Sequence, residues 1–285
     1  MDKLFDGKIL VIGLGEIGYT CSNYFKSIGI DVDGFDISQD AIKRALDAKI
    51  ISGVAKDFSG YDYYIVCIST HLPSNQFEPY LDSFFELIQT IANEGKPNSL
   101  ISIESTIPHG TTEKILEIVE HKMHVAHVPH RYYNKEKKDH GVNQLRVLGA
   151  SHNCCNKKAT DFYGGALGIP LHPVKSAEVA ELSKVIENTY RFLQIAFAEE
   201  LKMVCDSRNI SFDDLRNACN TKWNIDILET HSGIGGHCLP KDTKMFLSFE
   251  NEILPKSLLE TAMAVDLKYR EHIMKLPLLN QDQKS

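Results

Sequence analysis

The chain has 285 residues, of which 43% are hydrophobic and 24% charged, and its formal net charge is −7. This composition excludes wholesale disorder, and the acidic balance argues against general nucleic-acid binding, because phosphate contacts need a basic face. No run approaches about 18 apolar residues, so no membrane-spanning segment is predicted.

Residues 1–150 alternate short apolar runs with amphipathic segments. Strands are predicted at 8–12, 31–36, 63–68, 100–103, 124–128 and 145–149, and helices at 17–28, 38–48, 77–92 and 111–120. Ser38 is expected to cap the second helix. This alternation predicts an α/β domain of Rossmann type, with a doubly wound parallel sheet covered by helices on both faces.

The pattern changes after residue 173. One helical segment without Gly or Pro is predicted from 176 to 208, and shorter helices follow at 213–220, 242–249 and 257–275. Apolar residues occupy much of the circumference of the long helix, which is typical of a helix buried on several sides. We therefore expect a Rossmann domain over 1–173, an α-helical domain over 174–285, and a homodimer formed through the long helix.

The polar N-terminus, Met1 to Lys8, lacks the apolar stretch of a signal peptide, which predicts a cytoplasmic protein. The seven cysteines fit this compartment, since their number is odd and no Cys-x-x-Cys pair occurs. No second Cys/His pair at ligand spacing accompanies any of them, so no metal site is predicted.

Gly13, Gly15 and Gly18 form a Gly-x-Gly-x-x-Gly motif directly after the first predicted strand. Gly13 permits a tight turn, Gly15 lets the backbone approach a pyrophosphate, and Gly18 lets helix and strand pack closely. The helix that starts at Glu16 and Ile17 would present free N–H groups to an anion. The motif therefore favours dinucleotide binding over a glycine turn without function.

Asp36 ends the second predicted strand, 21 residues after Gly15. A carboxylate there can accept hydrogen bonds from both ribose hydroxyls, and it would repel the 2′-phosphate of NADP. The predicted cofactor is therefore NAD.

Two further motifs carry chemistry. Lys184 and Asn188 lie one turn apart on the long helix, where Lys could stabilise an alkoxide, although taken alone the pair is more typical of a solvated surface. The segment 233–242 contains three glycines, Cys238 and Asp242. Its backbone can close on a ligand, and a nearby helix N-terminus would stabilise a thiolate.

These motifs together resemble the UDP-glucose/GDP-mannose 6-dehydrogenases, a family of NAD-dependent nucleotide-sugar dehydrogenases that oxidise a primary alcohol to a carboxylate. The resemblance covers residues 8 to about 250. It rests on Val11–Gly18, Ser69-Thr70, Glu104–Thr111, Arg146–Gly149, Ala177–Lys184, Glu187-Asn188, Ala198–Leu201 and Gly235–Asp242. It implies a sugar or nucleotide-sugar substrate and a role in polysaccharide biosynthesis.

The resemblance also implies catalytic roles. Cys238 matches the nucleophile that attacks the aldehyde to give a thiohemiacetal, which is oxidised to a thioester and hydrolysed. Lys184 and Asn188 would hold the developing oxyanion, and Asp242 and Thr106 would position a water molecule.

Binding roles follow in the same way. The cofactor side of the cleft would be lined by Ser69, Thr70, Ser105 and Thr106. The substrate would be bound by His130, Arg131, Gly235 and Gly236, together with the Lys184–Asn188 pair.

The chain departs from the family pattern in two places. Family members carry Pro-Glu where this chain reads Val128-Pro-His130-Arg131, and that Glu helps hydrolyse the thioester. We expect His130 to serve as a base near neutral pH, or hydrolysis to be impaired. Family members also continue into a C-terminal nucleotide-gripping domain. We expect that domain to be absent, because the chain stops at Ser285.

Two alternatives remain open. A two-electron alcohol dehydrogenase of the 3-hydroxyacid type would share the Rossmann domain, the long helix and the Lys-x-x-x-Asn pair, but would not need Cys238. A non-catalytic NAD-binding protein is the other alternative, although it would have no need for the set of Cys238, Lys184, Asn188 and Asp242.

Overall fold

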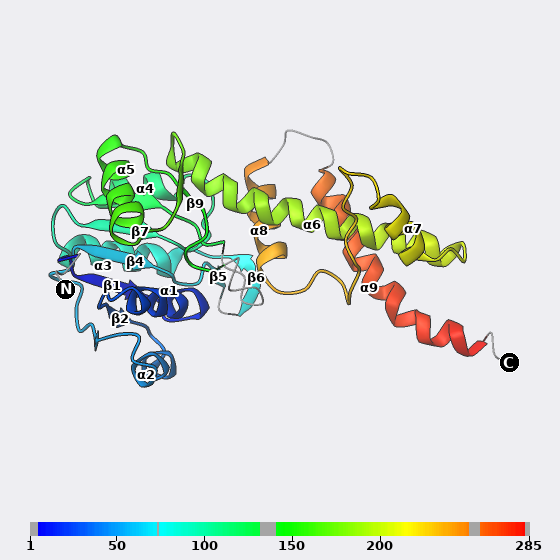
Figure 1. Cartoon of the computed structure of the whole chain (residues 1–285), viewed down its shortest axis with the longest axis horizontal. Helices are drawn as coiled ribbons and strands as arrows, with labels where there is room; N and C mark the ends of the chain where they lie inside the picture. The colour runs from blue at the N-terminus through cyan, green and yellow to red at the C-terminus, as the bar shows by residue number, and fades with distance from the viewer. Residues whose placement is uncertain (1–4, 73, 132–140, 251–256, 283–285) are drawn as a thin grey trace. The chain divides into compact units, whose positions relative to one another are not determined.

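The computed structural model describes residues 5–72, 74–131, 141–250 and 257–282 (Figure 1). The chain divides into two compact units: unit 1 comprises 1–72 and 80–184, and unit 2 comprises 73–79 and 185–285. The chain enters unit 2 within the long helix α6 (Ala177–Ser207), so this division falls later than residue 173. Within the described ranges, no helix combines the length and apolar character needed to cross a lipid bilayer.

Unit 1 is built on a parallel sheet with the strand order β3-β2-β1-β4-β7-β8. These strands are β1 (Ile9–Ile12), β2 (Asp33–Phe35), β3 (Gly53–Val54), β4 (Tyr63–Val66), β7 (Leu100–Ile103) and β8 (His124–His127). From β1 the chain adds β2 and β3 toward one edge of the sheet, and from β4 it adds β7 and β8 toward the other edge. The switch point of this doubly wound sheet therefore lies between β1 and β4. The predicted fold class is confirmed.

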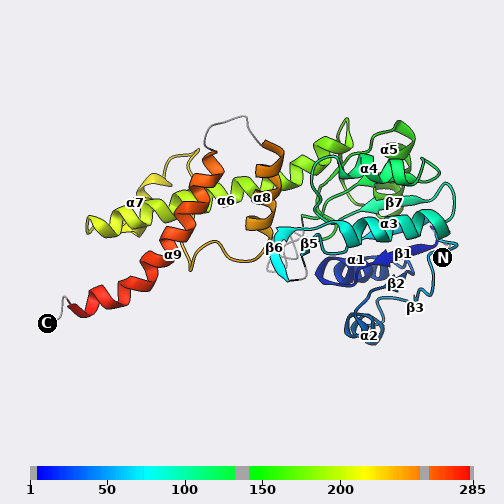
Figure 2. The same cartoon turned by 180° about the vertical axis from the view of Figure 1, so that it is seen from behind.

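Helices cover both faces of this sheet (Figures 1 and 2). They are α1 (Glu16–Ser27), α2 (Gln39–Asp47), α3 (Asp82–Glu94), α4 (Thr111–Ile118) and α5 (Asn153–Thr160). Ile9 and Val11 of β1 belong to one apolar cluster with residues of α1, α2 and α5, whereas Leu10 and Ile12 belong to a second with residues of α3 and α4. Successive strand residues point to opposite faces, so β1 is buried on both sides.

The predicted elements agree with the structure except in a few places. Ser38 caps α2 as expected, since its Oγ accepts from the backbone N–H of Ala41 at 3.3 Å. The helix predicted at 77–92 begins only at Asp82, because Asn75–Pro79 forms the strand β6. A proline disfavours helical backbone at the residue before it, so the helical prediction for the first residues of this segment was wrong.

Several short elements had no prediction. They are the strand β3, β5 (His71–Leu72), the helix α5, the π-helical turn η2 (Asp161–Ala166) and β10 (Leu171–Pro173). Strand β10 pairs in parallel with β9 (Arg146–Leu148).

Unit 2 consists mainly of helices: the rest of α6, α7 (Phe212–Cys219), α8 (Cys238–Glu250) and α9 (Leu258–Asp282). Phe192 and Ala196 of α6 form one small apolar core with Ile234 and Ala262. Helices α6 and α7 form another around Cys205 and Phe212. Helix α8 begins four residues before the predicted position, which puts Cys238 at its N-terminus.

Glu199, on α6, supports a prediction about pH. Its side chain is fully buried, and burial, together with the charge of Asp266, raises the pKa of Glu199 to about 8. The ordinary value is 4.5, so the folded chain holds a proton there that the unfolded chain loses, and stability falls as the pH rises from 4.5 to about 8. We expect Glu199→Gln to remove this loss and to stabilise the chain by about 2 kcal/mol at alkaline pH.

Urea denaturation across this pH range measures the effect. The matched control is Glu200→Gln, because Glu200 is the exposed neighbour on the same helix. A constant difference between wild type and Glu199→Gln from pH 4.5 to 8 would contradict the assignment.

Candidate active site

The residues predicted to bind a cofactor gather at the carboxyl ends of the parallel strands of unit 1. The glycine motif follows β1, Asp36 follows β2, Ser69 and Thr70 follow β4, and Ser105 and Thr106 follow β7. Open α/β sheets bind ligands in the crevice at this edge, beside the switch point. The topology thus brings segments far apart in the sequence to one place.

The three glycines of the motif face different constraints. Gly13 has a φ of 88°, and a Cβ there would lie 2.8 Å from the Cys67 carbonyl carbon. At Gly18, a Cβ would lie 1.7 Å from the Gly13 carbonyl oxygen, so only glycine lets α1 pack against β1. Gly15 is exposed and has no heavy atom within 4 Å of its Cβ position. The space beside Gly15, at the N-terminus of α1, therefore fits a pyrophosphate.

Replacement of Gly15 by alanine separates folding from binding. The new methyl group would meet no protein atom, so we expect stability to change by less than about 0.5 kcal/mol. The methyl group would occupy the space needed by the phosphates, so NAD⁺ affinity should fall by about tenfold or more. Thermal unfolding and NAD⁺ titration calorimetry measure the two effects.

Gly235→Ala is the matched control, because Gly235 also has no heavy atom within 4 Å of its Cβ position but lies outside the motif. Unchanged NAD⁺ affinity in a folded Gly15→Ala variant would mean that the phosphates bind elsewhere.

Asp36 is fixed by the backbone around it. One carboxylate oxygen accepts from the N–H of Leu14 at 2.6 Å, and the other accepts from the N–H of Ser38 at 2.8 Å. Arg44 of α2 donates to the Leu14 carbonyl at 2.8 Å and packs over the Tyr19 ring. Each carboxylate oxygen has a second lone pair available for a ribose hydroxyl. The residues present therefore fit NAD.

The loops after β4 and β7 are joined by hydroxyl groups. Thr70 Oγ1 donates to the Thr106 carbonyl at 2.7 Å, and Ser105 Oγ donates to the Ile68 carbonyl at 2.6 Å. Thr70 is buried, whereas Ser69 is exposed and Thr106 is half-buried. The structure thus brings together three of the four residues predicted on these loops and holds them against one another.

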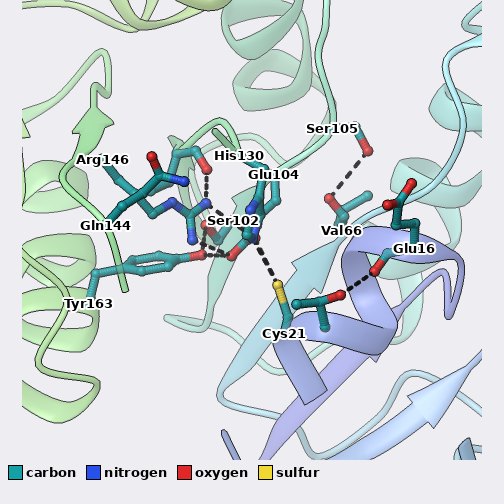
Figure 3. A network of polar contacts seen from close by, with 12 residues as sticks. Glu16, Cys21, Val66, Ser102, Glu104, Ser105, His130, Gln144, Arg146 and Tyr163 are labelled. Carbon is teal, nitrogen blue, oxygen red and sulfur yellow. Dashed lines mark hydrogen bonds and ion pairs between the residues drawn. The ribbon is translucent and has the colours of Figure 1, made fainter. Parts of the chain in front are cut away.

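A buried polar network lies beside these loops (Figure 3). Glu104 is at its centre and accepts from Arg146 Nη1 at 3.3 Å and from the Tyr163 hydroxyl at 2.5 Å. Arg146 Nη2 forms an ion pair with the same carboxylate at 3.1 Å. His130 Nε2 lies 2.8 Å from the Glu104 carboxylate and 3.0 Å from the sulfur of Cys21. All of these side chains are at least 96% buried, His130 being 4% exposed.

The charges of the network shift its titration. Burial alone would raise the pKa of Glu104, but Arg146 and His130 hold it well below its usual range. Burial alone would lower the pKa of His130, but Cys21 and Glu104 raise it. The sequence singled out only His130 here; Glu104 and Arg146 lay within noted segments without an assigned role. Arg131 is half-buried and donates to the Leu145 carbonyl at 3.1 Å.

The remaining predicted catalytic residues lie on helices α6 and α8. Cys238 is exposed and is the first residue of α8, with His237 Nε2 at 3.7 Å from its sulfur. The segment was predicted to place Cys238 near a helix N-terminus, and Cys238 lies at the N-terminus of α8.

The loop before Cys238 is anchored by α9. Asp266 accepts from the Ile234 N–H at 2.7 Å, Arg270 donates to the Ile234 carbonyl at 2.6 Å, and Tyr269 donates to the His231 carbonyl at 3.0 Å. Gly233 and Gly236 have φ values of 99° and 73°, which side chains rarely adopt. Gly233 and Gly235 line a cavity of about 350 Å³ that Arg191 and Arg216 also line. The loop is therefore a rigid wall of a concave surface.

Asn188 and Asp242 are brought into direct contact. Asn188 Nδ2 donates to Asp242 Oδ2 at 2.5 Å, and Lys241 Nζ forms an ion pair with the other oxygen, Oδ1, at 2.8 Å. Asp242 is 1% exposed, so Lys241 balances a charge that is removed from water. Sequence reasoning missed Lys241, although its place beside Asp242 was a signal. Lys184 is half-buried and lies four residues before Asn188 on α6.

Two family models match the chain. Residues 49–166 match the NAD-binding domain of the UDP-glucose/GDP-mannose dehydrogenase family, and residues 178–267 match its central domain. These matches fall on the α/β unit and on the helices that carry the Lys–Asn pair and Cys238.

Individual proteins agree with the family models. A UDP-N-acetyl-D-mannosamine dehydrogenase from Pyrococcus horikoshii is 30% identical over 283 residues, covering 86% of this chain and 65% of that protein. One from Campylobacter jejuni is 29% identical, covering 86% and 68%. The solved UDP-D-ManNAc dehydrogenase from P. horikoshii superimposes with a TM-score of 0.83 at 26% identity, covering 97% of this chain and 72% of that one. The chain thus spans slightly less than two thirds of the first relative.

Proposed function

Because the chain belongs to the UDP-glucose/GDP-mannose dehydrogenase family, we propose that it oxidises the primary alcohol of a sugar nucleotide to a carboxylate with two NAD⁺. The observation that carries the proposal is the arrangement around α8. A solvent-accessible cysteine stands at the helix N-terminus, and one turn later an Asn–Asp–Lys group is held in fixed geometry. A simple two-electron alcohol dehydrogenase needs no such cysteine.

Cys238 acts as the nucleophile. Its thiolate adds to the aldehyde left by the first oxidation and forms a thiohemiacetal, which the second oxidation turns into a thioester. Water then cleaves the C–S bond, releasing the carboxylate and restoring the thiolate. NAD⁺ is the hydride acceptor in both oxidations, and covalent attachment keeps the reactive aldehyde from leaving between them.

The neighbouring residues handle protons and developing charge. Lys184 and Asn188 hold the substrate oxygen while it carries negative charge. Asp242 positions the hydrolytic water. Asn188 donates to Asp242, which fixes the orientation of the amide before substrate binds. His130 lies where the family carries a glutamate, and its contact with Glu104 favours its protonated form. Its role as a base therefore depends on deprotonation at higher pH.

The substrate class follows from the relatives, which are named as dehydrogenases of UDP-N-acetyl-D-mannosamine. We propose a UDP-linked N-acetylhexosamine as substrate.

The deciding experiment is the number of NADH molecules released per molecule of limiting substrate. Purified protein is mixed with excess NAD⁺ and a panel of UDP-N-acetylhexosamines, UDP-glucose, GDP-mannose and free sugars. We expect two NADH for each UDP-N-acetylhexosamine consumed. One NADH with no thioester on Cys238 by intact mass would instead indicate the 3-hydroxyacid type of dehydrogenase. NAD⁺ binding without turnover on any member would indicate a non-catalytic protein.

The long helix also supports an assembly. Val179, Ile186, Tyr190, Phe197 and Val204 are each between 45% and 61% exposed. At 3.6 residues per turn, they project within about 40° of one another and form one apolar stripe along α6. We propose that two chains form a homodimer through this stripe, since a second copy carries the same stripe and closed dimers are the commonest assembly.

Light scattering measures the assembly directly. The wild type should have twice the 32.1 kDa mass of the chain, and a Tyr190→Glu/Phe197→Glu variant should be a monomer. Arg191→Glu is the control, because Arg191 is exposed on the same helix but away from the stripe. A monomeric wild type would rule the dimer out.

A further inference from the structure

Two histidines and two cysteines of unit 1 meet at a place that no part of the proposed reaction uses. His121 follows α4, His124 begins β8, and Cys154 and Cys155 lie in the first turn of α5. One ligand atom from each of the four lies within 4.8 Å of all the others. These residues are joined only by folding, since His121 and Cys154 are 33 positions apart.

The spacing of these atoms fits a tetrahedral metal ion. Zinc binds His nitrogen at about 2.0–2.1 Å and Cys sulfur at about 2.3 Å, so neighbouring N and S ligands of a tetrahedron lie about 3.6 Å apart. His121 Nε2 lies 3.4 Å from the sulfur of Cys154 and 3.6 Å from that of Cys155. From this geometry we propose that His121, His124, Cys154 and Cys155 form a zinc site.

The surroundings hold the ligands in place. The His121 ring stacks on His152, with centroids 4.5 Å apart and planes 14° from parallel. The backbone is left-handed at both Glu120 and His121, with φ values of 49° and 52°. Residues other than glycine rarely adopt this conformation, because it strains the backbone. Within the described ranges, His124 Nδ1 is buried and has no hydrogen-bond partner.

Charge and access also fit zinc. Two thiolates and two neutral imidazoles balance the charge of a divalent ion, and mixed Cys/His ligands select zinc over calcium or magnesium. His121 and Cys154 are exposed and His124 is half-buried, so an ion can enter from solvent. Cys155 is the one buried ligand of the four, with 1% of its surface exposed. Four protein ligands leave no open position for a substrate, so the site is structural.

The location supports the structural role. His124 is the first residue of β8 and pairs in register with Leu100, the first residue of β7. The ligands therefore lie at the amino ends of the strands, at the edge opposite the glycine motif. The metal would tie the turn before β8 to the first turn of α5. The sequence suggested no metal because His121-x-x-His124 and Cys154-Cys155 are not a usual spacing.

Metal content of the purified full chain tests the proposal. After equilibration at about 1 µM free Zn²⁺ and gel filtration, we expect one zinc ion per wild-type chain. Cys154→Ser and His121→Ala, both at exposed positions, should raise the Kd for zinc by about 100-fold or more, since loss of groups that merely support a ligand already costs about 10- to 100-fold. Co²⁺ should give visible bands of a tetrahedral site and a thiolate charge-transfer band that weakens in Cys154→Ser.

Cys219→Ser and His172→Ala are matched controls, because these residues lie outside the cluster. Both should retain the full zinc content. The proposal is overturned if the wild type retains no zinc, or if the ligand variants retain as much zinc as the controls. NAD⁺ affinity, measured in parallel, verifies that each variant is folded.

Discussion

Replacement of Cys238 by alanine should abolish carboxylate formation. In the proposed reaction, the thiolate at the start of α8 is the only group that captures the aldehyde, and the second oxidation acts on the captured form. Loss of a nucleophile that acts as part of a unit typically lowers turnover by several orders of magnitude, so we expect a decrease of at least about 10³-fold. The measurement is carboxylate product and NADH at saturating substrate.

The variant also separates the two oxidations. Cys238 is exposed, so its replacement should leave the fold and the NAD⁺ affinity of unit 1 unchanged. A trace of free aldehyde, with one NADH per molecule, would show that only the second step was lost. Cys219→Ala is the matched control, since Cys219 ends α7 and has no proposed role. If Cys238→Ala forms carboxylate at the wild-type rate, the proposed mechanism with Cys238 as nucleophile is wrong.

Much of the fold was predictable because local sequence and tertiary environment agree. The run from Leu100 to Ile103 was predicted as a strand with the bounds that β7 has, since it is mostly apolar and contains two β-branched isoleucines. In the structure all four residues are buried. Prediction failed where a tertiary contact or a proline decides. The apolar residues before Asp82 suggested a helix, but Pro79 ends a strand there. Helix α5, with several polar and charged residues, is held by its packing on the sheet through Cys155 and Ala159.

The candidate site likewise has parts that the sequence predicted and parts that it did not. The glycine motif, Asp36 and the Cys238 segment could be predicted as functional, because residue type and local spacing alone indicate the chemistry that they support. Contacts between distant segments were not visible. Sequence assigned His130 a catalytic role without indicating that it lies against Glu104. It also gave no sign that two histidines would meet two cysteines thirty or more positions away, because that pairing depends on how α5 packs on β8.

The Glu104 network should dominate the stability of unit 1. Arg146 is 1% exposed and contacts Glu104 through two nitrogens, and one of them also donates to the Val128 carbonyl. Arg146→Met keeps the apolar bulk but leaves the Glu104 carboxylate buried without its main counter-charge. Breaking a buried ion pair in this way costs about 3–5 kcal/mol, so we expect a loss of that size in urea denaturation.

The acid dependence and a double variant test whether the loss comes from this pair. Because the pKa of Glu104 is held below its ordinary 4.5, its contribution to stability is complete above pH 4.5 and is lost as the pH falls below that value. The difference in free energy of unfolding between wild type and Arg146→Met should therefore become smaller in acid.

Glu104→Gln/Arg146→Met removes both charges, so its loss of unfolding free energy should be smaller than the sum of the losses in the two single variants. Arg131→Met, at a half-buried arginine that donates to Leu145, is the control and should cost about 1 kcal/mol. Additive losses at every pH would mean that Arg146 stabilises unit 1 by packing alone.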